Sequence, residues 1–141
     1  MKKLVKLLSL VLVASMLLVC LASCDASGSI KKAYEKAEYT VNVVSGADDA
    51  ATVAFMALDL SEDAREELEE YEIIVCTKNV INIAAIVKFP SSGALKDFLT
   101  VEKDGKKDYS LYEKAKEEGK INGNCYLIGA TTDKAAEPFA K

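Results

Sequence analysis

The fold is decided by residues 72–87, which read EIIVCTKNVINIAAIV. β-Branched and other apolar residues dominate both halves of this stretch, so we predict two strands, 72–77 and 80–87. Lys78 and Asn79 separate them, and Asn79 tolerates the positive φ that a tight turn requires. Because residues 80–87 are almost wholly apolar, we expect the second strand to lie in the centre of a sheet, buried on both faces.

The same kind of pattern continues on both sides of this pair of strands. Residues 39–44 and 125–130 are rich in strand-forming residues and predict two further strands. Helical spacing of apolar residues predicts helices over 30–38, 48–58, 61–71, 94–102 and 109–118, and a short helical tail from 133.

After the first helix, the predicted order is β-α-β-β-α-β, the split β-α-β pattern of the ferredoxin-like fold. We therefore expect an α+β ferredoxin-like sandwich preceded by a short helix. Its antiparallel sheet would place the strands in the order fourth, first, third, second (4-1-3-2), which puts the apolar strand 80–87 in the interior of the sheet.

Composition limits the classes of function. The chain has 141 residues, half of them apolar, which is enough for one domain. It has no His, which excludes a Ser-His-Asp site, an H-E-x-x-H zinc site and a Cys-His pair, and we expect no catalytic residues, no cofactor and no metal site.

Residues 24–141 hold 15 basic and 22 acidic side chains, a net charge of −7. Nucleic-acid binding needs clustered Lys and Arg, so no nucleic-acid partner is expected.

The first 24 residues have the pattern of an export signal. Lys2, Lys3 and Lys6 precede an uncharged stretch, 7–19, which is too short for a comfortable bilayer span but typical of a secretory signal. Leu21-Ala22-Ser23-Cys24 follows and resembles the bacterial lipobox. The resemblance implies cleavage between Ser23 and Cys24 and a lipid on Cys24 as the mature N-terminus. The alternative is an uncleaved transmembrane anchor over residues 4–22.

The lipobox resemblance implies a lipid-anchored protein on the extracytoplasmic face of the cell membrane, in the style of Gram-positive Firmicutes. Three parts are expected: the signal peptide 1–23, a lipidated Cys with a flexible tether over 24–29, and a single α+β domain over 30–141. The tail GNCYLIG at 123–129, followed by a short helix to Phe139, is similar to that of small bacterial lipoproteins. This second resemblance implies a fold and carries no activity over.

Two cysteines remain in the predicted domain. Export makes a disulfide between Cys76 and Cys125 chemically feasible. The expected strand order places them on opposite edges of the sheet, beyond disulfide reach, so we predict two free, partly buried thiols. A disulfide between them would mean that the strand order is wrong.

Seven carboxylates crowd residues 62–72, and four of them make up a candidate acidic face for a partner: Glu62, Glu66, Glu69 and Glu70. The competing interpretation is a helix face that is merely solvated. A calcium loop is disfavoured, because the run has no Gly and a helix fans its carboxylates apart.

The function expected from these observations is a membrane-anchored, non-enzymatic interaction module for an unknown protein or envelope component. The alternative is a small-ligand or cation-binding lipoprotein associated with a transporter, which would require a pocket.

Overall fold

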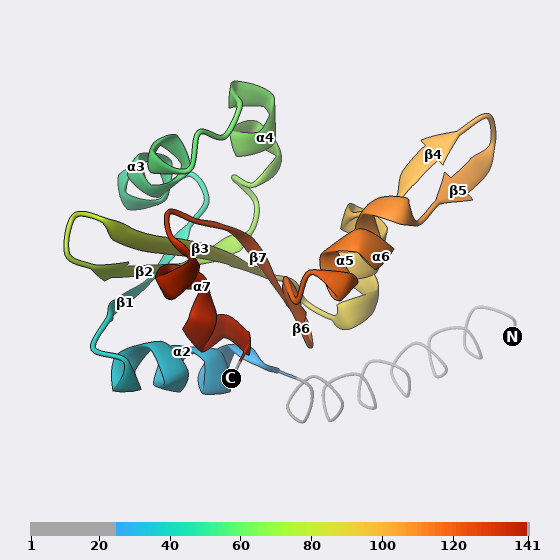
Figure 1. The fold of residues 1–141 in the computed structure, drawn as a ribbon. Helices are drawn as coiled ribbons and strands as arrows, with labels where there is room; N and C mark the ends of the chain where they lie inside the picture. Colours follow the sequence, from blue (N-terminus) through green and yellow to red (C-terminus); the bar gives the residue numbers. More distant parts are fainter. Residues whose placement is uncertain (1–24, 141) are drawn as a thin grey trace, which may run out of the picture.

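The computed structural model describes residues 25–140 (Figure 1). The predicted signal peptide, 1–23, and the predicted cleavage and lipidation site at Ser23 and Cys24 lie outside the described residues. Within residues 25–140, no helix combines the length and the apolar character needed to cross a membrane.

The described chain is an α+β protein, as predicted, with a short helix before the sheet. Its helices are α2 (Ser27–Lys36), α3 (Asp49–Ala57), α4 (Glu62–Glu67), α5 (Ser92–Phe98), α6 (Ser110–Glu117), α7 (Asp133–Ala136) and the 3-10 helix η1 (Glu137–Ala140). Its strands are β1 (Thr40–Ser45), β2 (Glu72–Lys78), β3 (Asn82–Lys88), β4 (Val101–Lys103), β5 (Lys106–Asp108), β6 (Ile121–Asn122) and β7 (Cys125–Ala130).

The main sheet is antiparallel and has the order β1-β2-β3-β7-β6, so the predicted order 4-1-3-2 is wrong. The predicted central position of the apolar strand is confirmed, because β3 is the middle strand. The error lies in the connections. Ser45 at the end of β1 lies opposite Glu72 at the start of β2, so the chain returns to the end of the sheet that it left. One helix between two strands carries the chain to the far end of the sheet, whereas the pair α3 and α4 brings it back.

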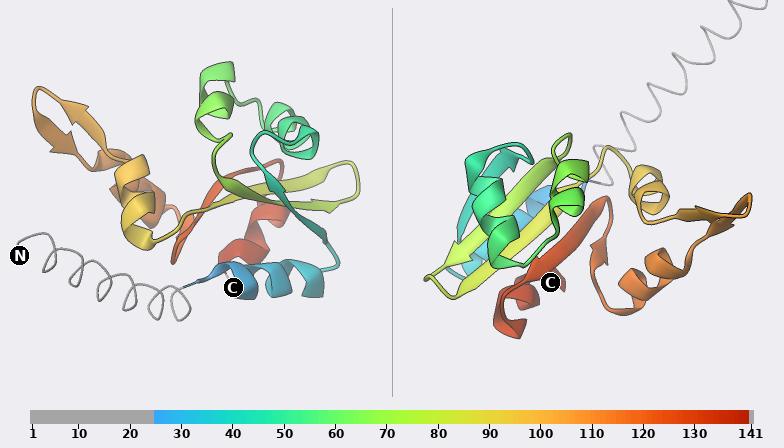
Figure 2. Two further views of the ribbon diagram at one scale, coloured as in Figure 1. Left: turned by 180° about the vertical axis from the view of Figure 1, so that it is seen from behind. Right: turned by 90° about the horizontal axis from the view of Figure 1, so that it is seen from above.

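Helices cover both faces of the sheet, which gives three layers instead of the two of the predicted sandwich (Figure 2). On one face, Ile73 and Val75 of β2 pack with α3 and α5. On the other, Ile74 and Cys76 pack with α2, α7 and η1. Alternate residues of β3 enter the two cores, so this strand is buried on both faces as its composition indicates.

Two segments differ from their predicted local structure. Val80 and Ile81 precede β3 and are exposed in the turn between β2 and β3, where Asn79 has the expected positive φ of 62°. Residues 101–108 form the β4–β5 hairpin, although a helix was predicted to continue to 102. Asp104 and Gly105, both at positive φ, close its turn. This hairpin projects from the body of the molecule (Figure 1).

The predicted flexible tether is wrong for residues 27–29, which form the first turn of α2. The composition Ser-Gly-Ser suggests flexibility, but the turn is held by groups distant in the sequence. Ile30 and Tyr34 are buried against the sheet, and Asn124 accepts a hydrogen bond from the backbone N–H of Ala26. Tertiary contacts therefore override the local preference of these residues.

Cys76 and Cys125 are both free, as predicted, but they are fully and not partly buried, and the predicted reason is wrong. Their strands flank β3 and do not lie at opposite edges of the sheet. The two thiols are also offset along β3, because Cys76 lies opposite Ala84 and Cys125 opposite Lys88. Burial raises the pKa of each thiol to about 12, which leaves both protonated and unreactive at neutral pH.

Candidate docking face

The layer formed by α3 and α4 carries the acidic residues singled out in the sequence. Each helix begins at a side-chain cap: Asp48 accepts from the N–H of Ala50 at 2.9 Å, and Ser61 from the N–H of Ala64 at 3.3 Å. Phe55 and Leu68 are buried beneath the layer. The caps set where the two helices begin, and the buried side chains of Phe55 on α3 and of Leu68, just after α4, hold this layer against the sheet.

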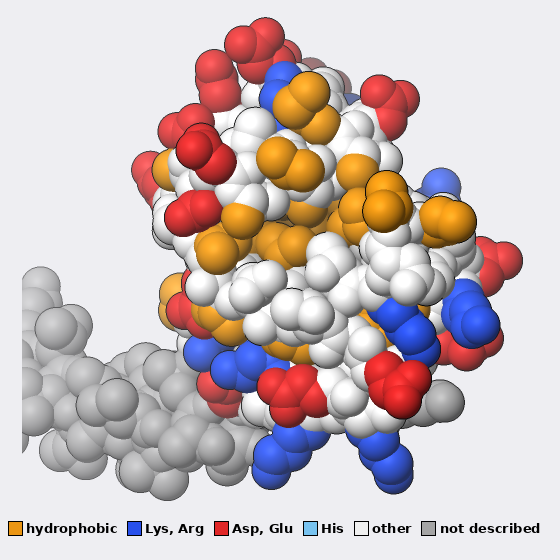
Figure 3. Space-filling model, turned by 90° about the vertical axis from the view of Figure 1, so that its left-hand side faces the viewer, with side chains coloured by type: hydrophobic (Ala, Val, Ile, Leu, Met, Phe, Trp, Pro, Cys, Tyr) orange, Lys and Arg blue, Asp and Glu red, His pale blue; other side chains and the backbone are white. Residues whose placement is uncertain are grey.

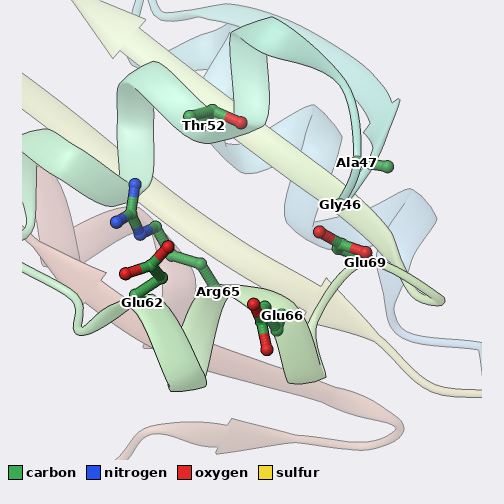
Figure 4. Close-up of a pocket in the computed structure, with 7 residues that line it drawn as sticks. All are labelled: Gly46, Ala47, Thr52, Glu62, Arg65, Glu66 and Glu69. Carbon is green, nitrogen blue, oxygen red and sulfur yellow. The ribbon is translucent and has the colours of Figure 1, made fainter.

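Three of the four predicted acidic residues come together around one pocket of about 200 Å³ (Figure 4). Its lining consists of Glu62, Arg65, Glu66 and Glu69 with Gly46, Ala47 and Thr52. Glu70 does not line this pocket and lies instead beside Tyr71 and Glu72, at a separate shallow depression next to β1. α4 ends at Glu67, and in the turn that follows, Glu69 stays at the pocket while Glu70 lies outside it.

The negative charge of the chain is concentrated in this layer. Residues 48–72 contain ten acidic side chains and one basic side chain, Arg65, a net of −9. The remaining residues of 24–141 therefore sum to +2. Three ion pairs occur among residues 25–140, and none includes a residue between 48 and 72. Glu72 lies opposite Lys88 on β3, which offsets part of this charge, and the rest of the acidic layer keeps a strong negative field.

Arg65 is the single base of the acidic layer. Its side chain extends from α4 toward α3 beside Glu62 (Figure 4). Its Nε is buried and has no hydrogen-bond partner within the described part of the chain. A buried donor of this kind is usually paired, which makes Arg65 Nε an exception among the described residues.

α3 also carries exposed apolar residues. Val53 and Met56 on α3 are 65% and 64% exposed. Met56 lies one helical turn after Thr52, which lines the pocket, so Met56 is on the pocket side of α3. Figure 3 shows hydrophobic side chains gathered on the side of the molecule that holds α3 and the β2–β3 turn, with acidic side chains around them. We call Val53, Met56, Glu62, Glu66 and Glu69 together the docking face.

Sequence reasoning identified the acids of the docking face and missed its apolar part. The sequence nevertheless contained a signal for these apolar residues. The predicted inner face of residues 48–58 already contained five apolar residues: Ala50, Ala51, Ala54, Phe55 and Leu58. Val53 and Met56 lie outside that face, and a surface helix has no second core to bury them in.

A second surface feature is a groove of about 520 Å³ between α2 and η1. It is lined by Ser29, Lys32, Ala33, Lys36, Ala37 and Pro138. Its two lysines lie one helical turn apart. Within residues 25–140, no group of three or more His, Cys, Asp or Glu side chains is placed to hold a metal ion.

No protein-family model, curated protein or solved structure matches this chain.

Proposed function

We propose that the protein is a lipoprotein anchored to the extracytoplasmic face of the cell membrane through Cys24, and that it binds a basic partner at the docking face without catalysing a reaction. The observation that carries the binding proposal is the coincidence of two features on one layer: a net charge of −9 over residues 48–72 and the exposed apolar side chains of Val53 and Met56. The export signal and the lipobox resemblance support the anchor.

The two features of the docking face have different physical roles. The concentrated negative charge attracts a cationic partner over about one Debye length and raises its rate of association. Val53 and Met56 then supply apolar area, which stabilises a complex by about 25 cal/mol per Å² removed from water. The partner that satisfies both is a segment with apolar side chains flanked by Lys or Arg, such as a basic amphipathic helix.

The anchor is tested with Cys24→Ala in the full chain. We expect the wild-type protein to partition with membranes and to carry the mass of the attached lipid. The variant is expected to lose both properties. A variant that still partitions with membranes at unchanged mass contradicts the lipid anchor.

The docking face is tested with a synthetic 14-residue amphipathic helix of Leu and Lys. We expect the double variant Glu62→Lys/Glu66→Lys to weaken its binding tenfold or more, about 1.4 kcal/mol, with a steep salt dependence in the wild type only. Glu113→Lys/Glu117→Lys is the matched control, because these residues form an exposed acidic pair with the same spacing on α6. Equal losses in both double variants would show that only net charge matters and would overturn the docking face.

A second candidate function follows from the α2–η1 groove. Its volume of about 520 Å³ is within the range of small-molecule sites, and Lys32 and Lys36 favour an anionic ligand over a cation. This arrangement would suit a ligand-binding lipoprotein that serves a transporter. A rise in melting temperature with an anionic metabolite, abolished by Lys32→Ala/Lys36→Ala, would support it.

A further inference from the structure

The chain is fixed to the domain from the first described residue onward. The carboxylate of Asp25 forms an ion pair with Lys88, with 3.2 Å between Oδ2 and Nζ. The other oxygen of the same carboxylate accepts a hydrogen bond from the N–H of Ser27 at 2.9 Å. Asp25 thus ties the start of α2 to the end of β3.

The next two residues are held as firmly. The N–H of Ala26 donates to Oδ1 of Asn124 at 3.1 Å, and Nδ2 of Asn124 donates to the carbonyl oxygen of Phe89 at 2.8 Å. Asn124 and Ser27 are both buried. Since consecutive Cα atoms lie 3.8 Å apart, a lipid on Cys24 would leave almost no free chain between the membrane and the folded body.

This attachment point lies on the opposite side of the molecule from the docking face. The chain enters α2 beneath the sheet, whereas α3 and α4 cover the other face (Figures 1 and 2). The two parts of the chain also differ in net charge. Anionic head groups repel residues 48–72, which carry a net charge of −9, whereas the remainder of residues 24–141 carries a net charge of +2.

We infer that the α2 side of the domain faces the bilayer and that the docking face points away from it. This inference rests on the proposed function, because it requires the lipid on Cys24. It also defines the kind of partner that the docking face fits. The partner is a basic protein or protein segment that approaches from outside the membrane, and not the bilayer-embedded part of a neighbouring membrane protein.

Energy transfer in reconstituted vesicles tests the orientation. The lipidated full chain carries a donor dye at Lys32→Cys on α2 or at Glu66→Cys on α4, both exposed positions. The native Cys76 and Cys125 are buried and do not compete for the label. With acceptor dye on the head groups of phosphatidylcholine vesicles, we expect transfer from position 32 to be several-fold more efficient than from position 66. Equal transfer from the two positions, or stronger transfer from position 66, overturns the inference.

A second variant tests whether the short attachment causes the orientation. Nine Gly and Ser residues inserted between Cys24 and Asp25 add up to about 30 Å of reach and leave the folded domain untouched. We expect the difference between the two donors to shrink in this variant. A difference that stays unchanged would show that the attachment does not set the orientation, and would overturn the inference in that form.

The outcomes separate the inference from the proposed function. A wild-type chain that does not enter vesicles overturns the lipid anchor and the orientation together. A chain that enters vesicles with equal transfer from both donors overturns the orientation alone. A chain that is oriented as expected but does not bind the Leu-Lys helix overturns the docking face alone.

Discussion

The two faces of the sheet are built from the same kinds of element and differ in what they leave exposed. Each face buries alternate residues of β2 and β3 under helices. Residues 25–47, which include α2, contain three acidic and three basic side chains and are neutral overall. Residues 48–72 on the other face carry −9 and expose Val53 and Met56. Folding requires neither of these last two features, and the proposed binding function is based on them.

The polar contacts of the two faces also differ in range. On the α2 face, the hydroxyl of Tyr34 donates to the carbonyl oxygen of Ala135 at 2.8 Å, and Asn122 donates to that of Phe139 at 3.1 Å. These bonds join α2, β6 and the C-terminal helices. On the α3–α4 face, the side chains of Asp48 and Ser61 cap their own helices, and the hydroxyl of Ser45 donates to the carbonyl oxygen of Glu69 at 3.3 Å. The carboxylates of Glu62, Glu66 and Glu69 form no ion pair within residues 25–140.

The largest effect that tests this comparison separates the inner and outer sides of α3. Phe55→Ala removes a fully buried ring and is expected to cost about 3–5 kcal/mol of unfolding free energy. Met56→Ala, one residue later, is expected to change stability by less than about 0.5 kcal/mol because Met56 is largely exposed. Chemical denaturation followed by circular dichroism measures both. A large loss for Met56→Ala would show that it belongs to the core and not to the docking face.

The elements of the fold were largely predictable from sequence, and their arrangement was not. The strand content of 72–87 follows from local composition, and so does the central position of β3. The order of strands depends on the connections. Each helical connection contains two helices, divided by the break at Leu60-Ser61 in the first and by the turn around Gly105 in the second. Because the second helix of each pair runs back, the chain returns to the end of the sheet that it left. Counting each helix pair as a single helix produced the incorrect order.

A smaller effect is expected at the junction between β1 and α3. A Cβ on Gly46 would collide with the backbone carbonyl group of Leu68, so Gly46→Ala must push the end of α4 and the turn that follows it outward. We expect a loss of about 1–3 kcal/mol in unfolding free energy, with weaker binding of the Leu-Lys helix because Gly46 lines the pocket. Gly93→Ala on α5, where an added Cβ meets no backbone, is the control. Equal stability of the two variants would contradict the close approach of α4 to Gly46.

The candidate site was predictable only in its charged part. Acidic residues are visible in a sequence as a run, so Glu62, Glu66 and Glu69 could be nominated directly. Their grouping around a pocket with Thr52 depends on how α3 and α4 pack, which local pattern does not specify. The fixing of residues 25–27 was hidden for the same reason, because Lys88 and Asn124 are distant in the sequence.

An effect of about 1 kcal/mol is expected from Tyr34→Phe on the α2 face. The substitution keeps the ring and removes the hydroxyl, which leaves the buried carbonyl oxygen of Ala135 without its donor. The loss in unfolding free energy is measured by denaturation. Tyr112→Phe serves as the control, since Tyr112 is only partly buried. Equal losses in the two variants would show that the hydrogen bond between α2 and α7 contributes nothing specific.

The smallest effect concerns the ion pair that fixes the start of α2. Burial raises the pKa of Asp25, but hydrogen bonds from Ser27 and the contact with Lys88 more than offset it, and the pKa falls from 3.8 to about 2. The carboxylate therefore stabilises the folded state above pH 4, and this contribution is lost as the pH falls from about 4 to 2. Because a third of the Asp25 side chain is exposed, the contribution is about 1 kcal/mol or less. Asp25→Asn is expected to remove this part of the pH dependence, and Glu38→Gln, which breaks the exposed pair with Lys78, is the matched control. If Asp25→Asn leaves the acid profile of unfolding unchanged, the attachment of residue 25 to β3 is too weak to orient the domain.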